Sequence, residues 1–210
     1  PTIWAESGAN FGKVARQAAS RGLAGLAWAC GIPGTVGGAV FGNAGAHGED
    51  VAGHLVMAEI LHQSGQRTLW SADDLRYKYR SSRLKQDLIP AIILAARFRL
   101  EPDTVEHIQQ KMEQYTEFRH RTQPPGASMG SMFKNPPEDY AGRLIEAAGL
   151  KGTRIGDAEI SPLHANFFIN HGEATAKDIY TLLKLTQETV AEKFDLNLEP
   201  EIELLGDWER

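Results

Sequence analysis

Four short stretches of this 210-residue chain carry groups suited to binding or catalysis, and the first is Tyr79-Arg80-Ser81-Ser82. An arginine stays charged at physiological pH and can hold a carboxylate with two parallel hydrogen bonds. Arg80 is therefore a candidate for binding a carboxylate. On spacing alone, an ordinary surface arginine is the simpler explanation.

The second stretch, from Gly130 to Pro136, places a hydroxyl, an ammonium and an amide within a few residues of each other. Ser131, Lys134 and Asn135 supply these groups, and Phe133 is expected to anchor them. The stretch has no histidine beside the serine and lacks the GxSxG elbow. A serine hydrolase is therefore not indicated.

The third stretch is an acidic segment near the C-terminus, where we predict a final strand over Glu201 to Leu205. With the two-residue period of a strand, Glu199, Glu201 and Glu203 would project to one face. A solvated sheet edge would show the same pattern. The spacing does not say which glutamate, if any, points into a site.

The fourth stretch is glycine-rich and runs from Gly31 to Asp50, GIPGTVGGAVFGNAGAHGED. It has neither the GxxxxGK[ST] pattern of a phosphate-binding loop nor GxGxxG between a strand and a helix. Backbone without Cβ atoms allows a large flat ligand to reach main-chain N–H and C=O groups. A tight double turn under a sheet edge explains the glycines equally well, so spacing alone leaves both interpretations open.

The elements that must position these stretches alternate between strands and helices. In the first half we predict strands at residues 1–6, 55–61, 67–70 and 89–100, and a helix over residues 11–20. Asn10 is the predicted cap of that helix. Ser71 followed by Asp74 predicts a capping box at a further short helix.

The pattern changes after residue 102, where an amphipathic helical stripe runs from Val105 to Phe118 and a polar, proline-containing loop follows. Beyond it we predict helices over residues 141–148 and 175–194 and a strand at residues 167–170. The sequence therefore predicts an α+β protein of two domains, residues 1–102 and 103–210.

Composition restricts the partners. The net charge is −5 without a basic stripe, so nucleic acid is not expected. No apolar run approaches the roughly 20 residues that span a bilayer, and no signal peptide is evident, so we expect a cytoplasmic protein without membrane insertion. Cys30 is the only cysteine and the seven histidines are scattered, so no metal site is expected. Nothing in the sequence indicates an oligomer.

Six stretches, in this order, carry a resemblance to a known family: GIPGTVGGAVFGNAGAHG, YRSS, GSMFKNP, AGRLIEAAGLKGTRIGDAEIS, HANFFIN and LEPEIELLG. Together they closely resemble the UDP-N-acetylenolpyruvoylglucosamine reductase (MurB) family of peptidoglycan precursor synthesis. The resemblance implies a vanillyl-alcohol-oxidase-like FAD-binding domain and a C-terminal substrate-binding domain. It also implies that NADPH reduces FAD, whose N5 then delivers hydride to UDP-N-acetylglucosamine enolpyruvate, giving UDP-N-acetylmuramate.

The resemblance also assigns roles to residues. Arg80 would bind the substrate carboxylate, Glu201 would polarise it, and Ser131 would donate a proton, with Lys134 as a helper. Substrate contacts would come from Tyr79, Lys134, Asn135 and His164. Contacts to FAD would come from Gly31, Ile32, Pro33, Gly34, Thr35, Val36, Gly37, Gly38, Asn43, Ala44, Gly45 and Gly48.

Two departures from the family pattern qualify the resemblance. The short connection after YRSSRLK resembles the subtype without an additional substrate-clamping loop. The family's GxGSN turn, expected before the segment PTIWAE, is not in this sequence, so we expect a truncated chain whose retention of FAD is open. The alternatives are another flavin oxidase of the same superfamily and a non-catalytic sugar-nucleotide-binding fragment.

Overall fold

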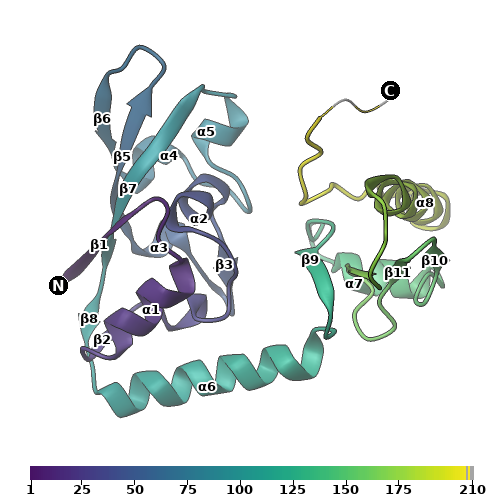
Figure 1. Ribbon diagram of the computed structural model, residues 1–210, viewed down its shortest axis with the longest axis horizontal. Helices are drawn as coiled ribbons and strands as arrows, with labels where there is room; N and C mark the ends of the chain where they lie inside the picture. The colour runs from purple at the N-terminus through teal and green to yellow at the C-terminus, as the bar shows by residue number, and fades with distance from the viewer. Residues whose placement is uncertain (207, 209–210) are drawn as a thin grey trace. The chain divides into compact units, whose positions relative to one another are not determined.

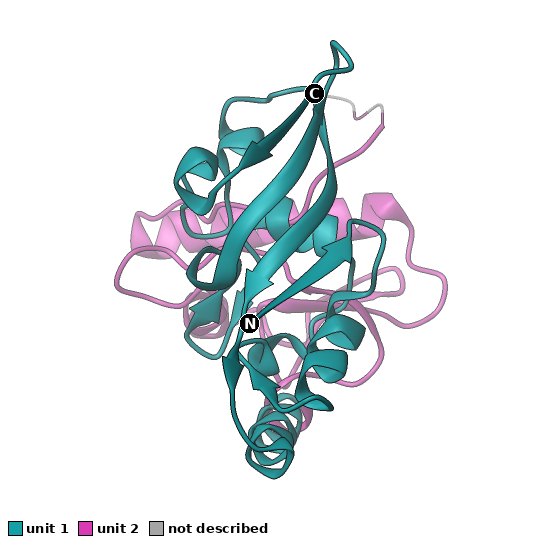
Figure 2. Ribbon diagram, turned by 90° about the vertical axis from the view of Figure 1, so that its left-hand side faces the viewer, with its two compact units in different colours: residues 1–119 teal, residues 120–210 magenta. Residues whose placement is uncertain are grey.

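The computed structural model describes residues 1–206 and 208 and contains two compact units, Pro1–Arg119 and His120–Arg210 (Figures 1 and 2). Each unit combines an antiparallel sheet with helices. The predicted α+β class is therefore confirmed.

The centre of unit 1 is a four-stranded antiparallel sheet in the order β1-β7-β5-β6. Its strands are β1 (Thr2–Glu6), β5 (Leu55–His62), β6 (Arg67–Trp70) and β7 (Ala91–Arg99), which confirms the four predicted strands. The hairpin of β5 and β6 pairs Ala58 with Trp70. A separate two-stranded sheet joins β2 (Leu23–Ala24) to β8 (Glu101–Pro102).

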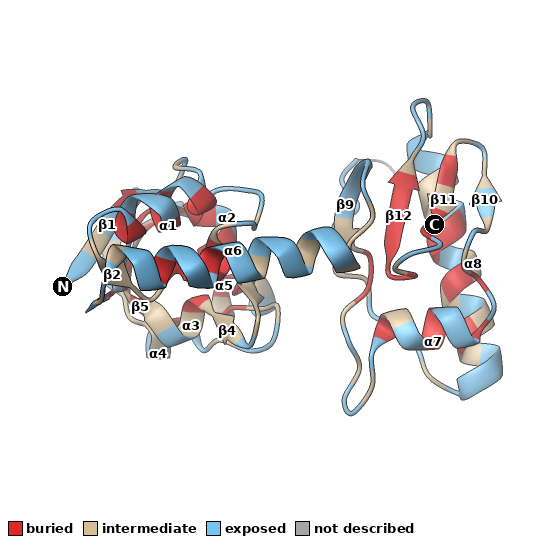
Figure 3. Cartoon of the chain, turned by 90° about the horizontal axis from the view of Figure 1, so that it is seen from below, coloured by how far each residue is buried: buried red, intermediate tan, exposed pale blue. Residues whose placement is uncertain are grey.

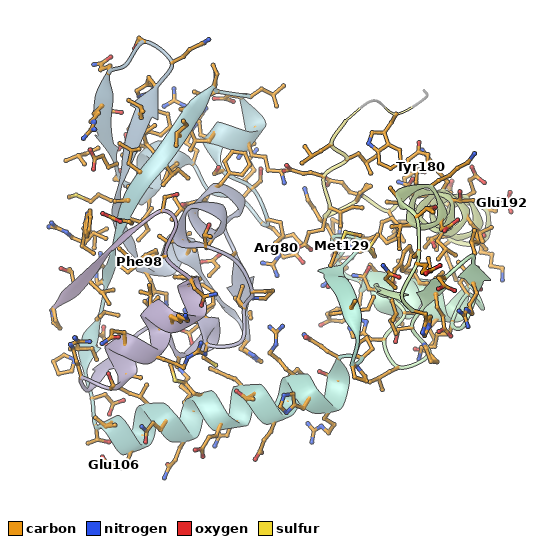
Figure 4. The ribbon with its side chains drawn as sticks, in the orientation of Figure 1. Arg80, Phe98, Glu106, Met129, Tyr180 and Glu192 are labelled. Atoms are coloured by element: carbon orange, nitrogen blue, oxygen red, sulfur yellow. The ribbon has the colours of Figure 1, made fainter. Side chains whose placement is uncertain are left out.

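Helix α1 (Phe11–Ala19) begins where predicted, because the side chain of Asn10 accepts a hydrogen bond from the backbone N–H of Lys13. Phe11 is fully buried and packs against Trp28 of the 3₁₀ helix η1 (Ala27–Ala29) and Phe98 of β7, with ring centroids 5.6 and 5.4 Å away. Figure 4 shows Phe98 in the interior of unit 1. These aromatic contacts join the helical layer to the sheet.

The glycine-rich stretch forms regular structure that the sequence did not predict. It contains helix α2 (Val36–Gly42) and a hairpin of β3 (Gly45–Ala46) and β4 (Glu49–Asp50). The two residues of the hairpin turn, His47 and Gly48, both have positive φ, 55° and 81°. This is the backbone that tight antiparallel hairpins require, and glycine adopts it without strain.

Three further short helices complete unit 1: α3 (Val51–His54), α4 (Ala72–Leu75) and α5 (Arg83–Gln86). The predicted capping box of α4 is confirmed, because Ser71 and Asp74 exchange side-chain to backbone hydrogen bonds in both directions. The helix stops at Arg76, which has φ of 43°.

Helix α6 (Val105–Thr122) begins in unit 1, and only the first half of its predicted stripe is buried (Figure 3). Ile108 and Met112 belong to the core of unit 1, whereas Phe118 is 48% exposed. The ring of Tyr115 stacks on His47 at a centroid distance of 4.0 Å. Because these contacts attach α6 to unit 1, the compact units divide after Arg119, further along the chain than the predicted division after residue 102.

Unit 2 is built on a second four-stranded antiparallel sheet in the order β10-β11-β12-β9. Its strands are β9 (Ala127–Ser131), β10 (Arg154–Ile155), β11 (Ala158–Ile160) and β12 (Phe167–Asn170), and its helices are α7 (Ala141–Ala147) and α8 (Ala176–Phe194). Strand β12 and both helices are as predicted. The prediction of a loop throughout residues 121–139 was wrong, because residues 121–122 belong to α6 and residues 127–131 pair with β12 as β9.

The predicted strand from Glu201 to Leu205 is also wrong. The nearest strand-like contact is an isolated bridge between Phe133 and Pro200. Leu204 and Leu205 are 43% and 84% exposed, so no buried face drives pairing beyond that bridge. The two-residue alternation therefore does not place Glu199, Glu201 and Glu203 on one face of a strand.

Residues 1–206 and 208 contain neither a membrane-spanning helix nor a cluster of metal ligands. No helix there is long and apolar enough to cross a membrane. No group of three or more histidine, cysteine, aspartate or glutamate side chains in this part of the chain is arranged to hold a metal ion.

Two neighbouring glycines of α2 provide a matched test of how tightly α2 packs. A Cβ at Gly37 would lie 1.9 Å from Oγ and 3.1 Å from Cβ of Ser7, so rotating the hydroxyl away does not remove the clash. We expect Gly37→Ala to lower the free energy of unfolding by about 1–3 kcal/mol in urea denaturation. A Cβ at Gly38 meets only the Thr35 hydroxyl at 3.6 Å.

Gly38→Ala is therefore the control, and we expect it to be neutral or to stabilise by up to about 1 kcal/mol, since alanine is the better helix former. Equal effects of the two substitutions would contradict this packing.

Candidate functional site

A small pocket of about 160 Å³ opens on the exposed side of the glycine-rich stretch in unit 1. Six of the residues predicted to contact FAD line it, together with Phe11 and Ala39, which the sequence reasoning missed. The six are Ile32, Pro33, Gly34, Thr35, Gly38 and Ala44. Neither Gly34 nor Gly38 would bring a Cβ closer than 3.6 Å to another residue, so nothing packs over them.

Five other residues predicted to contact FAD have packing or hydrogen-bonding roles inside unit 1. The N–H groups of Val36 and Gly37 donate to the carbonyls of Ala9 and Ser7, both at 2.9 Å. Gly31 and Gly45 lie against close neighbours. A Cβ at Gly31 would lie 2.9 Å from Cδ of Arg119, and a Cβ at Gly45 would lie 2.7 Å from the carbonyl oxygen of Glu49. Gly48 forms the hairpin turn.

Asn43, also predicted to contact FAD, is 3% exposed and ends α2 with a positive φ of 47°. Its Nδ2 donates to Oδ2 of Asp50 and to the carbonyl of Lys78, both at 3.1 Å, and its Oδ1 accepts from the N–H of Ala52 at 3.0 Å. Both N–H groups and the oxygen of the side-chain amide are therefore bonded within unit 1.

The last carbonyls of α2 receive hydrogen bonds from the chain around Arg80. Tyr77 donates its hydroxyl to the carbonyl of Val40 at 2.9 Å, and Ser82 donates to the carbonyl of Phe41 at 2.7 Å. Ser82 is fully buried, and burial raises the pKa of Tyr77, which therefore stays a donor. Side chains of residues 77–82 thus complete the C-terminal end of the helix.

Arg80 lies between these anchors in a turn closed by reciprocal backbone hydrogen bonds between Lys78 and Ser81 of 3.0 and 3.1 Å. Its φ is 53°, a conformation that costs a non-glycine residue about 1–2 kcal/mol. Its Nη2 donates to the carbonyl of Gly45 at 2.8 Å, and its guanidinium lies 5.0 Å from the ring centroid of Tyr79. Strain kept at a charged residue is typical of functional sites.

Unit 2 contains a larger pocket of about 390 Å³, within the size range of small-molecule sites. Three residues predicted from the sequence, Ser131, Asn135 and His164, line it. Residues that the sequence reasoning did not single out complete the lining: Tyr140, Gly142, Arg143, Glu146, Leu163, Ala165 and Asn166. The structure therefore brings the hydroxyl and amide residues of one stretch, Ser131 and Asn135, together with a histidine from a separate part of unit 2.

The segment after Ser131 is held by main-chain bonds to the acidic segment. The N–H of Lys134 donates to the carbonyl of Glu199, and the N–H of Glu201 donates to the carbonyl of Met132, both at 2.8 Å. Glu201 is thus attached next to Ser131 along the backbone, although neither it nor Lys134 lines the pocket. The Lys134 ammonium forms an ion pair with Glu199.

His164 presents a neutral imidazole to the pocket. Burial lowers its pKa from 6.5, and the positive charge of Lys151 lowers it further, whereas an interaction with its own backbone and the carboxylate of Glu146 oppose this shift. The N–H of Asn166 approaches Nδ1 at 3.2 Å, so Nδ1 is an acceptor and the proton of the neutral ring lies on Nε2. His164 can therefore offer one neutral N–H donor to a ligand.

Of two missed lining residues, Arg143 and Asn166, only the first carried a recognisable signal in the sequence. Arg143 forms an ion pair with Asp139 four residues earlier and holds the pKa of that carboxyl at about 2. The i,i+4 spacing of opposite charges at the start of a helix was readable from the sequence. Asn166 is 3% exposed, and a single asparagine next to a buried strand gave no such signal.

The comparisons with known proteins divide the chain in a similar way. Residues 1–68 match the FAD binding domain family, and residues 121–205 match the C-terminal domain of UDP-N-acetylenolpyruvoylglucosamine reductase.

Curated relatives are similar over nearly the whole chain. The UDP-N-acetylenolpyruvoylglucosamine reductase of Chloroflexus aggregans is 48% identical, over 97% of this chain and 69% of its own length. The reductase of Rubrobacter xylanophilus is 45% identical, over 98% of this chain and 69% of its own. The crystal structure of the Thermus caldophilus enzyme (MurB) superposes with a TM-score of 0.85 at 38% identity, covering 96% of this chain and 71% of that one.

We expect Ser82→Ala to destabilise unit 1, because it leaves the buried carbonyl of Phe41 without its donor. The free energy of unfolding, measured by urea denaturation, should fall by about 1–3 kcal/mol. The control is Ser81→Ala, since the Ser81 hydroxyl makes no hydrogen bond to the described residues. A change of less than about 0.5 kcal/mol for Ser82→Ala would show that the turn does not depend on this bond.

We expect His164 to titrate below pH 6.5 when followed by NMR of its ring protons. Since the unfolded chain takes up this proton at a higher pH than the folded chain, the contribution to stability is complete above about pH 6.5 and is lost as the pH falls towards the folded pKa. His164→Gln should remove that part of the pH dependence. A folded pKa at or above 6.5 would refute the assignment.

Proposed function

The chain belongs to the UDP-N-acetylenolpyruvoylglucosamine reductase family, and on that basis we propose that it reduces the enolpyruvyl group of UDP-N-acetylglucosamine enolpyruvate to the lactyl ether of UDP-N-acetylmuramate. The main structural support for this proposal is the pocket of unit 2, which is lined by Ser131, Asn135 and His164. The match of residues 121–205 to the C-terminal domain of the reductase favours this reaction over a flavin oxidase or a binding fragment.

The exposed backbone at Gly34 and Gly38 fits the approach of a flat cofactor, because no side chain covers it. The volume of about 160 Å³ accommodates only part of a dinucleotide, since sites for small ligands usually exceed about 300 Å³. Residues around this pocket would therefore bind one portion of FAD. The chemistry that bound FAD would supply is hydride, taken from NADPH, for the terminal carbon of the enolpyruvyl group.

Addition of hydride to an enol ether that bears a carboxylate places negative charge on the adjacent carbon and the carboxylate. Arg80 would stabilise this charge, since its guanidinium is always ionised and its turn is fixed by α2. Glu201 would polarise the same carboxylate through a proton or hydrogen bond. Its backbone attachment to Met132 is what supports this role.

Ser131 would protonate the adjacent carbon and complete the reduction. A serine hydroxyl is a weak acid, so it can act only if it is held against the carbon and the developing charge is strong. Lys134 lies three residues further on, and its ammonium would favour loss of the proton. Asn135 and His164 would hold the nucleotide sugar in the pocket, His164 through its Nε2 proton. Tyr79 would also contact the substrate.

The reductant would be NADPH, and the protein would act in the cytoplasm, where the reaction would supply peptidoglycan precursor. The experiment combines the chain with FAD and follows two half-reactions separately: flavin reduction by NADPH and flavin reoxidation by the enolpyruvyl substrate. We expect both with the unaltered chain.

Ser131→Ala should slow reoxidation by the enolpyruvyl substrate by about 100-fold or more and leave reduction by NADPH nearly unchanged, because only the second half-reaction needs the proton. Stopped-flow absorbance of the flavin measures both rates. Ser128→Ala, on the exposed part of the same strand, is the control. Equal damage to both half-reactions would refute the role of Ser131, and no reoxidation by the unaltered, FAD-loaded chain would refute the proposed function.

A further inference from the structure

The segment that carries Ser131 leaves the sheet of unit 2 at a position where regular pairing stops. Strand β9 ends at Ser131, which pairs with Phe167 of β12. The pairing of β9 with β12 is irregular between Phe167 and Ile169. Met132, Phe133 and Lys134 therefore need other partners for their backbone groups, since Met132 and Phe133 are completely buried.

Asn166 supplies these partners. Its carbonyl oxygen accepts from the N–H of Met132 at 2.8 Å. Its side-chain Oδ1 accepts from the N–H of Phe133 at 2.9 Å, and its Nδ2 donates to the carbonyl of Phe133 at 2.8 Å. The side-chain amide thus replaces the two hydrogen bonds that an adjacent strand residue would make.

The same residue reaches the pocket and, indirectly, the acidic segment. Its N–H donates to Nδ1 of His164 at 3.2 Å, which fixes the tautomer of that ring. On the opposite edge, Met132 and Lys134 bond to the main chain of Glu201 and Glu199. The segment from Ser131 to Lys134 is therefore held between Asn166 and residues 199–201.

We propose that Asn166 is a positioning residue for the reaction: its buried amide fixes the backbone that carries Ser131 and, through His164, the donor that faces the ligand. This inference rests on the proposed role of Ser131. Asn166 itself touches the pocket wall but is assigned no proton or charge in the reaction. A misplacement of about 1 Å can cost roughly 100-fold in rate, so two hydrogen bonds at this point can decide activity.

Asn170, the last residue of β12, provides a matched control four residues further along the chain. Its Oδ1 also accepts two backbone N–H bonds, from Gly172 and Ala174 at 2.8 and 3.0 Å, and these neighbours do not belong to the pocket. Asn170→Ala therefore removes a comparable set of bonds without touching the Ser131 segment.

The first test is amide hydrogen exchange on the whole chain, which needs neither cofactor nor activity. In Asn166→Ala, the N–H of Phe133 should exchange at least about tenfold faster than in the unaltered chain, the factor that corresponds to 1.4 kcal/mol. Asn166→Asp keeps an acceptor for that N–H, so its exchange rate at Phe133 should lie between those of the unaltered chain and Asn166→Ala. Asn170→Ala should leave Phe133 unchanged.

The second test uses the FAD-loaded chain. Asn166→Ala should slow reoxidation by the enolpyruvyl substrate by roughly 10- to 100-fold, raise its solvent deuterium isotope effect because proton transfer becomes limiting, and leave reduction by NADPH unchanged. A purely structural role would not change the isotope effect.

Three outcomes would overturn the inference: unchanged exchange at Phe133 in Asn166→Ala, the same acceleration in Asn170→Ala, or equal loss in both half-reactions. Absence of reoxidation in the unaltered chain would instead refute the proposed function, and the exchange result would still decide whether Asn166 fixes this segment.

Discussion

Backbone groups that regular structure leaves unpaired must find partners when they are buried, and both candidate sites depend on how this chain meets that requirement. As in every α-helix, the last carbonyls of α2 have no partner within the helix. The hydroxyls of Tyr77 and Ser82 bond to two of them, and the amide of Asn43 bonds to the intervening turn. Arg80 is fixed in a strained conformation because both sides of its turn are attached.

Unit 2 meets the same requirement with one residue. The amide of Asn166 takes the place of a strand beside Phe133, and the chain from Ser131 to Lys134 is bound on its other edge by residues 199–201. The hydroxyl of Ser131 and the ring of His164 therefore reach one pocket from separate parts of the sequence. Short elements with side-chain partners can position such groups as firmly as long regular strands.

Much of the fold follows from local patterns, because caps and periodicity act over a few residues. Asn10, Ser71 and Thr175 cap helices in the way that their sequence contexts predict. The failures occurred where distant partners decide the structure. The glycine-rich stretch forms α2 because Ser7 and Ala9 accept its first N–H groups, and β9 forms because β12 is available to pair with it.

The candidate site shows the same division. The side-chain chemistry of Ser131, Asn135 and His164 made them candidates from the sequence. That they line one pocket could be seen only in the folded structure. Asn43 was predicted to bind the cofactor, and the structure adds a role that the sequence did not predict, since its side chain bonds to Asp50, Lys78 and Ala52 at the end of α2. Asn166 gave no local signal, since its partners lie more than 30 residues away.

We propose that the pocket lined by Ser131, Asn135 and His164 receives the nucleotide sugar. Titrating the chain with UDP-N-acetylglucosamine enolpyruvate while following ¹H–¹⁵N NMR signals would show where this ligand binds. We predict saturable shifts at Ser131, the Asn135 side chain and His164, with Asn170 unaffected. Saturable shifts confined to other residues, or none at millimolar ligand, would contradict the account.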